Sequence, residues 1–246
     1  MPGQYVPNAP SGPVSGSGES QGRPYDEGMA KRTYDQYCGL ARALDIVGER
    51  WTLLLVRELL IGPARYTDLL EALPGIGTNL LAARLKDLEA LGVIKRVPQP
   101  QPAGAFHYEI APLGEELRPA VVNLARWGLQ LLGAPTPRMA VSATWGFLAL
   151  QSMVQDAPAR DVGEAYEFRV DDSVFHVITG PGDVAVGKGP VEAPSVVLET
   201  DAATFVAVGS GHESPVAAAR DGRVKVTGDS EAFARCCELL GLALSA

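Results

Sequence analysis

Residues 75–97, GIGTNLLAARLKDLEALGVIKRV, constrain the fold most, because their spacing predicts a helix with two different faces. At about 100° per residue, Leu81, Leu85 and Leu88 share one stripe, as expected of a side that packs on a core. The flanks of this stripe carry Leu80, Leu91 and Arg84. The opposite side carries short side chains, one amide and one lysine: Asn79, Ala82, Ala83, Lys86 and Ala90.

Two interpretations of this outer face remain open. A solvated helix face usually carries long charged residues, whereas this one suits close approach by another molecule. In a helix-turn-helix the second helix enters the major groove, where short side chains allow base contacts and an asparagine can bind adenine. The alternative is an ordinary amphipathic surface helix.

The charge of the chain is unevenly distributed. Its 246 residues, 46% of them hydrophobic, suffice for one large or two modest domains, and the net charge of −8 excludes a uniformly basic coat. Residues 31–138 contain 13 Lys and Arg against 11 Asp and Glu, whereas residues 139–246 contain 7 against 15. A DNA contact, if there is one, is therefore expected in the first half.

Three cysteines, Cys38, Cys236 and Cys237, are too few for a disulfide framework, and their spacing does not resemble a zinc site. We expect no metal and no cofactor. The sequence shows neither a signal peptide nor a membrane span, so we expect a cytoplasmic protein. Residues 1–30 are rich in Gly, Pro and Ser and are predicted to be a disordered tail.

The first half predicts a helical domain that ends in a hairpin and a long helix. Helices are expected at residues 34–47, 49–60 and 66–73, ahead of the stretch at 75–97. Two alternating segments, 93–97 and 106–110, predict strands, joined by a loop rich in proline and glutamine. A helix is expected at 112–132. A hairpin directly after a recognition helix is a wing.

In this region the sequence resembles the HxlR-type winged helix-turn-helix regulators. The resemblance rests on Cys38 ahead of ARAL, on GERWTLLLVRELLIGPARYTDLLEALPGIGTNLLAARLKDLEALGVI, and on HYEIAPLGEEL and LARWG, and it spans about residues 37–128. It implies a winged helix-turn-helix domain, residues 31–133, in a homodimer built by the first and last helices. It further implies a sequence-specific transcriptional regulator whose paired recognition helices bind a pseudo-palindromic operator in double-stranded DNA.

The expected DNA contacts lie on the recognition helix, before the preceding helix, and at the base of the wing. They are Arg65, Tyr66, Thr78, Asn79, Ala82, Ala83, Lys86, Lys95, Arg96 and His107. Because the wing tip lacks Arg and Lys, we expect phosphate contact at its base rather than minor-groove insertion. Arg65 has the alternative of a solvated cation, and Tyr66 of a core aromatic. Arg84 has the alternative of an ion pair with an acid such as Glu71.

Two departures from the family pattern affect helix caps. Gly77 stands where relatives usually have Ser, and Ala111 where they usually have Thr, so both caps are expected to be weaker.

Cys38 has two interpretations. In redox- and electrophile-sensing members of this family, a cysteine at this position on the dimer-forming helix is the switch, so Cys38 is a redox-sensing candidate. The alternative is a small buried thiol. Cys236 and Cys237 are expected in the core, and Trp51 and Trp127 as core and interface aromatics.

A linker at residues 134–140 separates the second domain, residues 141–246. Helices are expected at 141–154, 201–208, 214–220 and 229–242, and strands at 166–170, 174–179, 183–188, 195–199 and 223–226. This pattern predicts an α+β domain with an antiparallel sheet.

The order of these elements, with YEFRVDDSVFHV, VVLETDAATFVAVGSG and AARDGRVKVTGDSEAFARCCELLG, resembles a sterol-carrier-protein-like domain. The resemblance implies a hydrophobic cavity for an apolar small-molecule effector. Candidate lining residues, each of which could equally be core, are Trp145, Phe168, Phe175, Val177, Leu198 and Phe205. His176 and His212 have no paired nucleophile or ligand set, so an enzyme is not expected. The rival hypothesis is a lipid carrier whose helical half only dimerises it.

Overall fold

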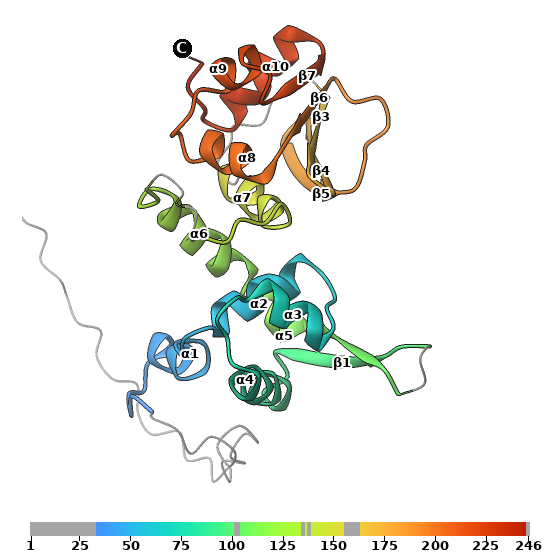
Figure 1. The fold of residues 1–246 in the computed structure, drawn as a ribbon. Coiled ribbons are helices and arrows are strands. Elements are labelled where there is room, and N and C mark those ends of the chain that lie inside the picture. Colours follow the sequence, from blue (N-terminus) through green and yellow to red (C-terminus); the bar gives the residue numbers. More distant parts are fainter. Residues whose placement is uncertain (1–32, 101–103, 134–135, 137–138, 155–162, 245–246) are drawn as a thin grey trace, which may run out of the picture.

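The computed structural model describes residues 33–100, 104–133, 136, 139–154 and 163–244. The predicted tail at 1–30 and most of the predicted linker lie outside these residues. Two domains stack end to end, and helices α6 and α7 lie where they meet (Figure 1). Within the described segments, none of the helices combines the length and the hydropathy of a membrane span.

The first domain has the predicted order of helices followed by a hairpin and a helical end. Its elements are α1 (Gly39–Val47), α2 (Thr52–Ile61), α3 (Tyr66–Ala72), α4 (Thr78–Ala90), β1 (Ile94–Pro98), β2 (Phe106–Ile110), α5 (Pro112–Glu115) and α6 (Arg118–Leu129). Strands β1 and β2 pair antiparallel, from Ile94 opposite Ile110 to Pro98 opposite Phe106. This is the winged helix-turn-helix arrangement.

The largest departures from the predicted helix bounds concern three helices, one of which is α7 of the second domain, which begins at Trp145 rather than at residue 141. Helix α1 begins at Gly39 rather than at residue 34, because Asp35 adopts a positive φ of 51° and Cys38 is extended. The helix expected at 112–132 is broken between α5 and α6. Pro119 lacks an amide hydrogen and its ring would clash with the carbonyl of Glu115, so one continuous helix cannot run through this point.

The leucine stripe of α4 is the inner face of this domain, as predicted. Leu81, Leu85 and Leu88 are each at most 1% exposed. They pack in one cluster with Leu55 of α2 and Leu69 of α3. Burying such a stripe supplies most of the stability of a short helix, and it fixes which side of α4 faces outward.

The second domain is α+β, as predicted, and its sheet is mixed rather than wholly antiparallel. Its elements are α7 (Trp145–Val154), β3 (Glu164–Val170), β4 (Ser173–Gly180), β5 (Asp183–Lys188), β6 (Val196–Thr200), α8 (Ala202–Gly209), α9 (Pro215–Arg220), β7 (Lys225–Gly228) and α10 (Ser230–Leu239). The strand order is β5-β4-β3-β6-β7, and β6 pairs parallel to β3. The reason is that β4 already occupies one edge of β3, so the chain returns from β5 across the sheet to the opposite edge.

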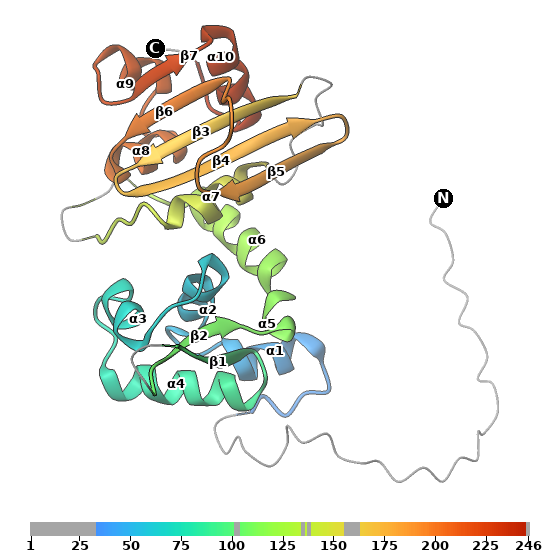
Figure 2. The ribbon, with the colours of Figure 1, turned by 90° about the vertical axis from the view of Figure 1, so that its right-hand side faces the viewer.

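Helices α7, α8 and α10 lie on one face of this sheet (Figure 2). The core beneath them contains Phe168, Phe175 and Phe205, with ring centroids 5.7–6.2 Å apart. Gly146 of α7 permits this packing, because an added Cβ would lie 2.8 Å from the ring of Phe175 and 2.9 Å from that of Phe205. Cys236 and Cys237 are buried in this domain, as predicted. Burial raises the pKa of Cys237 to about 11.

Candidate nucleic-acid interface

The outward face of α4 carries the short side chains predicted for it. Thr78, Asn79, Ala82 and Lys86 are exposed and Ala83 is half-buried. Gly77 precedes the helix in an extended conformation and provides no side-chain cap. The first amide groups of α4 therefore have no side-chain acceptor at the N-cap, and a phosphate oxygen is able to take that place.

Two polar contacts hold α4 in place. The hydroxyl of Tyr66 donates to the carbonyl of Thr78 over 2.8 Å, which joins the start of α3 to the first turn of α4. The guanidinium of Arg84 lies 3.0 Å from the carboxylate of Glu49 and 3.7 Å from that of Asp87. Arg84 therefore forms an intramolecular ion pair, which was its alternative role, but with Glu49 and Asp87 rather than with Glu71.

Arg65 and Lys86 are the exposed cations beside this face. Arg65 precedes α3, and its backbone amide donates to the carboxylate of Asp68 over 2.8 Å. Within the part of the chain that the structure describes, neither its guanidinium nor the ammonium of Lys86 forms an ion pair. Both charges are therefore available to a phosphate backbone.

The cations at the base of the wing face acids of the same domain. Lys95 lies 3.1 Å from Glu109, and Arg96 lies 2.7 Å from Glu89. His107 lies 2.6 Å from Glu109 through Nε2, and its Nδ1 contacts Gln99. Hydrogen bonds from His107 and Lys95 lower the pKa of Glu109, so this carboxylate remains charged. The wing base consequently contributes little net positive charge, and sequence reasoning had missed these acids.

Cys38 is exposed in the described chain and occupies the N-cap position of α1. Hydrogen bonds from the backbone amides of Ala41 and Leu40 lower the pKa of its thiol. Amides at a helix start stabilise a thiolate, which is the reactive form. The alternative of a buried thiol does not hold for this single chain.

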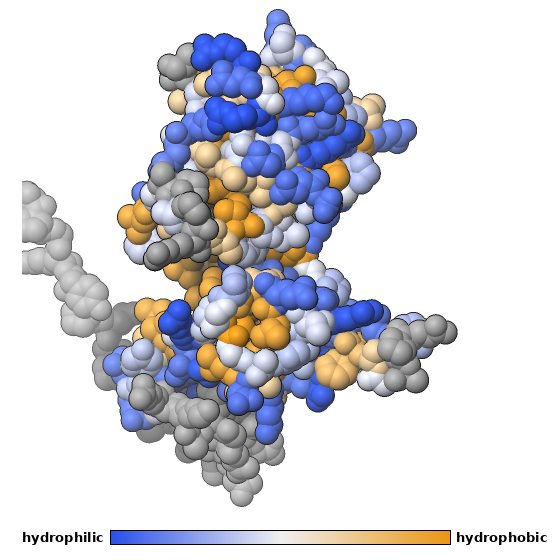
Figure 3. All heavy atoms as spheres, in the orientation of Figure 1, coloured by the Kyte–Doolittle hydropathy of each residue, from blue (hydrophilic) through white to orange (hydrophobic). Residues whose placement is uncertain are grey.

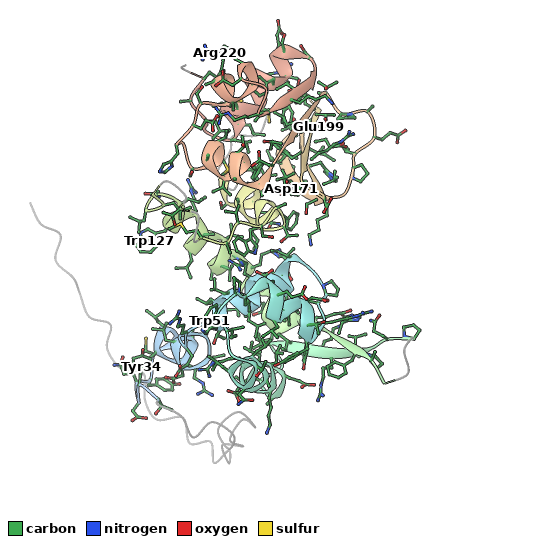
Figure 4. All side chains as sticks on the ribbon, in the orientation of Figure 1. Tyr34, Trp51, Trp127, Asp171, Glu199 and Arg220 are labelled. Carbon is green, nitrogen blue, oxygen red and sulfur yellow. The ribbon has the colours of Figure 1, made fainter. Side chains whose placement is uncertain are left out.

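Apolar side chains remain exposed on α1, on α6, and on the segments before α1 and after α6. We call these residues the apolar face: Tyr37, Leu40, Leu44, Leu124, Trp127 and Leu131. Trp127, at 63% exposure, projects from α6 away from the domain junction (Figure 4). Trp51, in contrast, packs against the first domain's core. Isolated exposed apolar residues are common, but six large ones on these two helices and the segments beside them make this part of the domain a candidate contact surface.

Comparison with known proteins agrees with this arrangement. Residues 46–135 match the family model of the HxlR-like helix-turn-helix. The uncharacterized HTH-type transcriptional regulator YvaP of Bacillus subtilis (strain 168) is 34% identical over 89 residues, which are 36% of this chain and 82% of YvaP. The chain belongs to the HxlR-like helix-turn-helix family.

Another relative of this HxlR-like chain is an uncharacterized HTH-type transcriptional regulator from Mycobacterium tuberculosis (strain CDC 1551 / Oshkosh). It is 40% identical over 96 residues, which are 39% of this chain and 60% of the relative, so the match leaves two fifths of that protein uncovered. Among solved structures, a transcriptional regulator of the MarR family from Porphyromonas gingivalis W83 aligns with 30% identity and a TM-score of 0.38. That alignment covers 42% of this chain and 100% of the other.

The second half of the HxlR-like chain matches a different family. Residues 147–240 match the model of the SCP-2 sterol transfer family. Phe168, Leu198 and Phe205 line a cavity of about 50 Å³ inside this domain. Trp145 and Phe205 line a larger cavity, of about 550 Å³, between the two domains. Phe175 and Val177 line neither and are core residues, at most 2% exposed.

The domain junction of this HxlR-like protein is held by polar contacts that the sequence had not suggested. The indole Nε1 of Trp145 donates to Glu58 of α2 over 2.9 Å, and the guanidinium of Arg57 lies 4.1 Å from the centroid of the Trp145 ring. Arg118 of α6 donates to the carbonyl of Leu60 over 3.0 Å and to Gln151 of α7 over 3.4 Å. Three helices from two domains are thereby connected.

Proposed function

We propose that this chain is a sequence-specific DNA-binding transcriptional regulator that acts as a homodimer on a pseudo-palindromic operator. The observation that supports it best is the outer face of α4, where Asn79, Ala82 and Lys86 are exposed on the side opposite the buried leucines. A helix with this face fits a major groove, with Asn79 able to bind an adenine and the alanines able to approach thymine methyl groups.

Phosphate contacts orient α4 in the groove. In this proposal Arg65 and Lys86 bind phosphates directly, and Thr78 does so through its hydroxyl and the exposed start of the helix. At the wing base, the DNA phosphates would meet Lys95, Arg96 and His107. Their acidic partners, Glu89 and Glu109, offset part of this positive charge. Tyr66 acts by positioning, because its hydroxyl proton is already donated to Thr78.

The homodimer forms through the apolar face. Leu40 of α1 is 68% exposed and Leu131, just beyond α6, is 66% exposed. Covering such side chains by the same surface of a second copy removes them from water and places two α4 helices side by side. Cys38 lies at the start of α1, so oxidation or alkylation of its thiol would alter the spacing of the paired helices.

The second domain is proposed to bind an apolar small-molecule effector, rather than to make the protein a lipid carrier. A carrier needs an interior cavity that encloses its cargo. The cavity inside the core of this domain, about 50 Å³, is far below the roughly 300–1,000 Å³ of small-molecule sites. A larger pocket of about 640 Å³ at the edge of the domain is lined partly by polar residues such as His212 and Ser214, which do not suit an apolar cargo. The feature that favours an effector is the apolar cavity of about 550 Å³ at the domain junction.

The test is selection of bound duplexes from a random-sequence library by the full chain, followed by anisotropy titration of the enriched duplex. We expect an enriched sequence with two inverted half-sites about one helical turn apart. Light scattering of the complex should give two chains per duplex. Absence of any enriched sequence, together with binding that salt abolishes equally on all duplexes, would contradict the proposal.

A further inference from the structure

The junction of the two domains contains an apolar cavity of about 550 Å³. This volume lies within the range of small-molecule sites. One wall comes from α2 and α6 of the DNA-binding domain, and the other from α7 and α8 of the second domain. The main side chains are Leu53, Leu54, Val121, Leu129, Trp145 and Phe205. Figure 3 shows hydrophobic residues gathered along the waist between the domains.

The polar groups in these walls already have partners. Arg57, the charged residue among the described lining residues, forms an ion pair with Glu58. The indole Nε1 of Trp145 donates to the same carboxylate, and the hydroxyl of Ser210 donates to the carbonyl of Val206 over 2.7 Å. A charged ligand would therefore lose its hydration without gaining a free partner. A neutral apolar ligand would lose only its contact with water.

Two glycines open into this cavity from opposite walls. Gly128 belongs to α6 and Gly209 to α8, and a Cβ added to either would meet no atom within 4 Å. Neither has a positive φ, so the backbone does not require glycine at these positions. The absence of side chains there leaves the cavity open.

We propose that this junction is the binding site of a neutral, apolar small molecule, distinct from the interior of the SCP-2-like domain. The ligand contacts both domains at once. Helix α6 contributes to this cavity through Gly128 and to the apolar face through Trp127, about a quarter turn away. Binding of the ligand in the cavity is thus coupled to the geometry of the dimer. This coupling rests on the homodimer of the proposed function. The ligand shifts DNA affinity to the extent that it binds two dimer geometries unequally.

The test uses N-phenyl-1-naphthylamine, a neutral fluorescent probe, with the full chain. We expect saturable binding with a Kd of roughly micromolar order. The variants Gly128→Leu and Gly209→Leu fill the cavity from either side and should each weaken binding by at least about tenfold. Gly128→Ala and Gly209→Ala are the matched controls, which leave most of the volume and should bind nearly as the parent does. Unchanged binding in both leucine variants would overturn the site.

A second probe tests the ligand class. 8-Anilinonaphthalene-1-sulfonate has the same ring body with an added sulfonate, and we expect it to bind at least about tenfold more weakly. Equal or tighter binding would overturn the neutral class in favour of an acidic ligand. Light scattering tests whether a second copy of the chain, rather than a small molecule, fills the cavity. If Gly209→Leu abolishes the dimer without changing probe binding, the cavity belongs to the interface between copies.

Operator binding is measured on the same samples. Probe binding with intact operator affinity in the absence of probe supports both proposals. If the parent chain does not bind the probe but still binds its operator, this inference alone is overturned. A chain that binds the probe but selects no operator overturns the proposed function and leaves the site standing.

Discussion

The indole of Trp145, the first residue of α7, donates a 2.9 Å hydrogen bond to the buried carboxylate of Glu58 in α2. The same carboxylate pairs with Arg57, whose guanidinium stacks over the indole ring. One residue of the second domain is therefore fixed by a charged pair of the first. The hydrogen bond and the cation–π contact that join the two domains could not be predicted from either family pattern alone.

Trp145→Phe should loosen this junction while leaving both cores intact. The phenyl ring keeps much of the packing but removes the donor to Glu58, and losing a hydrogen bond to a charged group costs roughly 1.5–3 kcal/mol. We expect a lower melting temperature and faster proteolytic separation of the domains. Arg220→Ala is the control, because Arg220 is exposed in the second domain and lies far from the junction (Figure 4). Identical proteolysis of the two variants would contradict the prediction.

Asn79→Ala should reduce specific operator binding by roughly 1–3 kcal/mol, the usual worth of one good base contact. Binding to random duplexes and the melting temperature should change little, because Asn79 is exposed and its substitution leaves the core untouched. Anisotropy titrations on operator and random DNA provide the measurement. An equal loss on both would remove Asn79 from the residues that determine sequence preference.

Arg65→Ala and Lys86→Ala should weaken binding to all sequences alike. Each should flatten the dependence of log K on log salt by about one unit, as loss of one phosphate contact does. Arg220→Ala is the control, since Arg220 is an exposed arginine at the far end of the second domain (Figure 4). If the slope is unchanged for both test variants, the proposed docking of α4 is wrong.

Cys38 should be the reactive cysteine of the native protein. Its thiol is exposed and its pKa is lowered by backbone amides, so the thiolate fraction at neutral pH exceeds that of an ordinary cysteine. Cys236 and Cys237 are buried and should react with iodoacetamide only after denaturation. Mass spectrometry after a short pulse of reagent measures this difference. Protection of Cys38 that disappears on dilution would place it within the dimer interface.

Glu164 should make the second domain sensitive to acid. Its buried carboxylate accepts hydrogen bonds from Arg235 at 2.6–3.1 Å and from the Tyr166 hydroxyl at 2.6 Å, and the bond from Arg235 is the main cause of its lowered pKa. Because the folded-state pKa of Glu164 lies below 4.5, the ordinary value for a glutamate, the stabilisation is complete above that pH. It is lost as pH falls through the folded-state pKa.

Glu164→Gln should therefore lower the urea midpoint at pH 7 by an amount corresponding to roughly 1–3 kcal/mol, and it should flatten the fall of the midpoint below pH 4.5. Glu231→Gln is a suitable control, because that side chain is 83% exposed and lies 3.4 Å from the same arginine. If the urea midpoint of Glu164→Gln falls with pH in the same way as that of the parent chain, another group controls the loss of stability in acid.

Local patterns predicted most of the elements and the inner face of α4. The leucine spacing gave the buried stripe because helical periodicity depends only on neighbours in sequence, and the hairpin turns marked β3, β4 and β5 for the same reason. The helix break ahead of Pro119 also had a local signal, the proline itself, but the apolar periodicity on either side outweighed it in the prediction.

Non-local relationships were beyond reach from one sequence. The parallel pairing of β6 with β3 depends on which sheet edge is free after β4 and β5 have formed. The acids opposite Lys95 and Arg96 come from another element or from across the hairpin. The junction cavity requires two domains to be placed together, whereas each family pattern describes only one.

The central position of β3 affects how the second domain can assemble during synthesis. Strands β3, β4 and β5 are joined by short turns and can pair as soon as they emerge. The other edge of β3 remains unpaired until β6 and β7 have been translated, by which time the first domain is already complete. We therefore expect chains that stall between β5 and β6 to carry a folded amino-terminal half beside an open sheet edge, and such an edge is prone to aggregate.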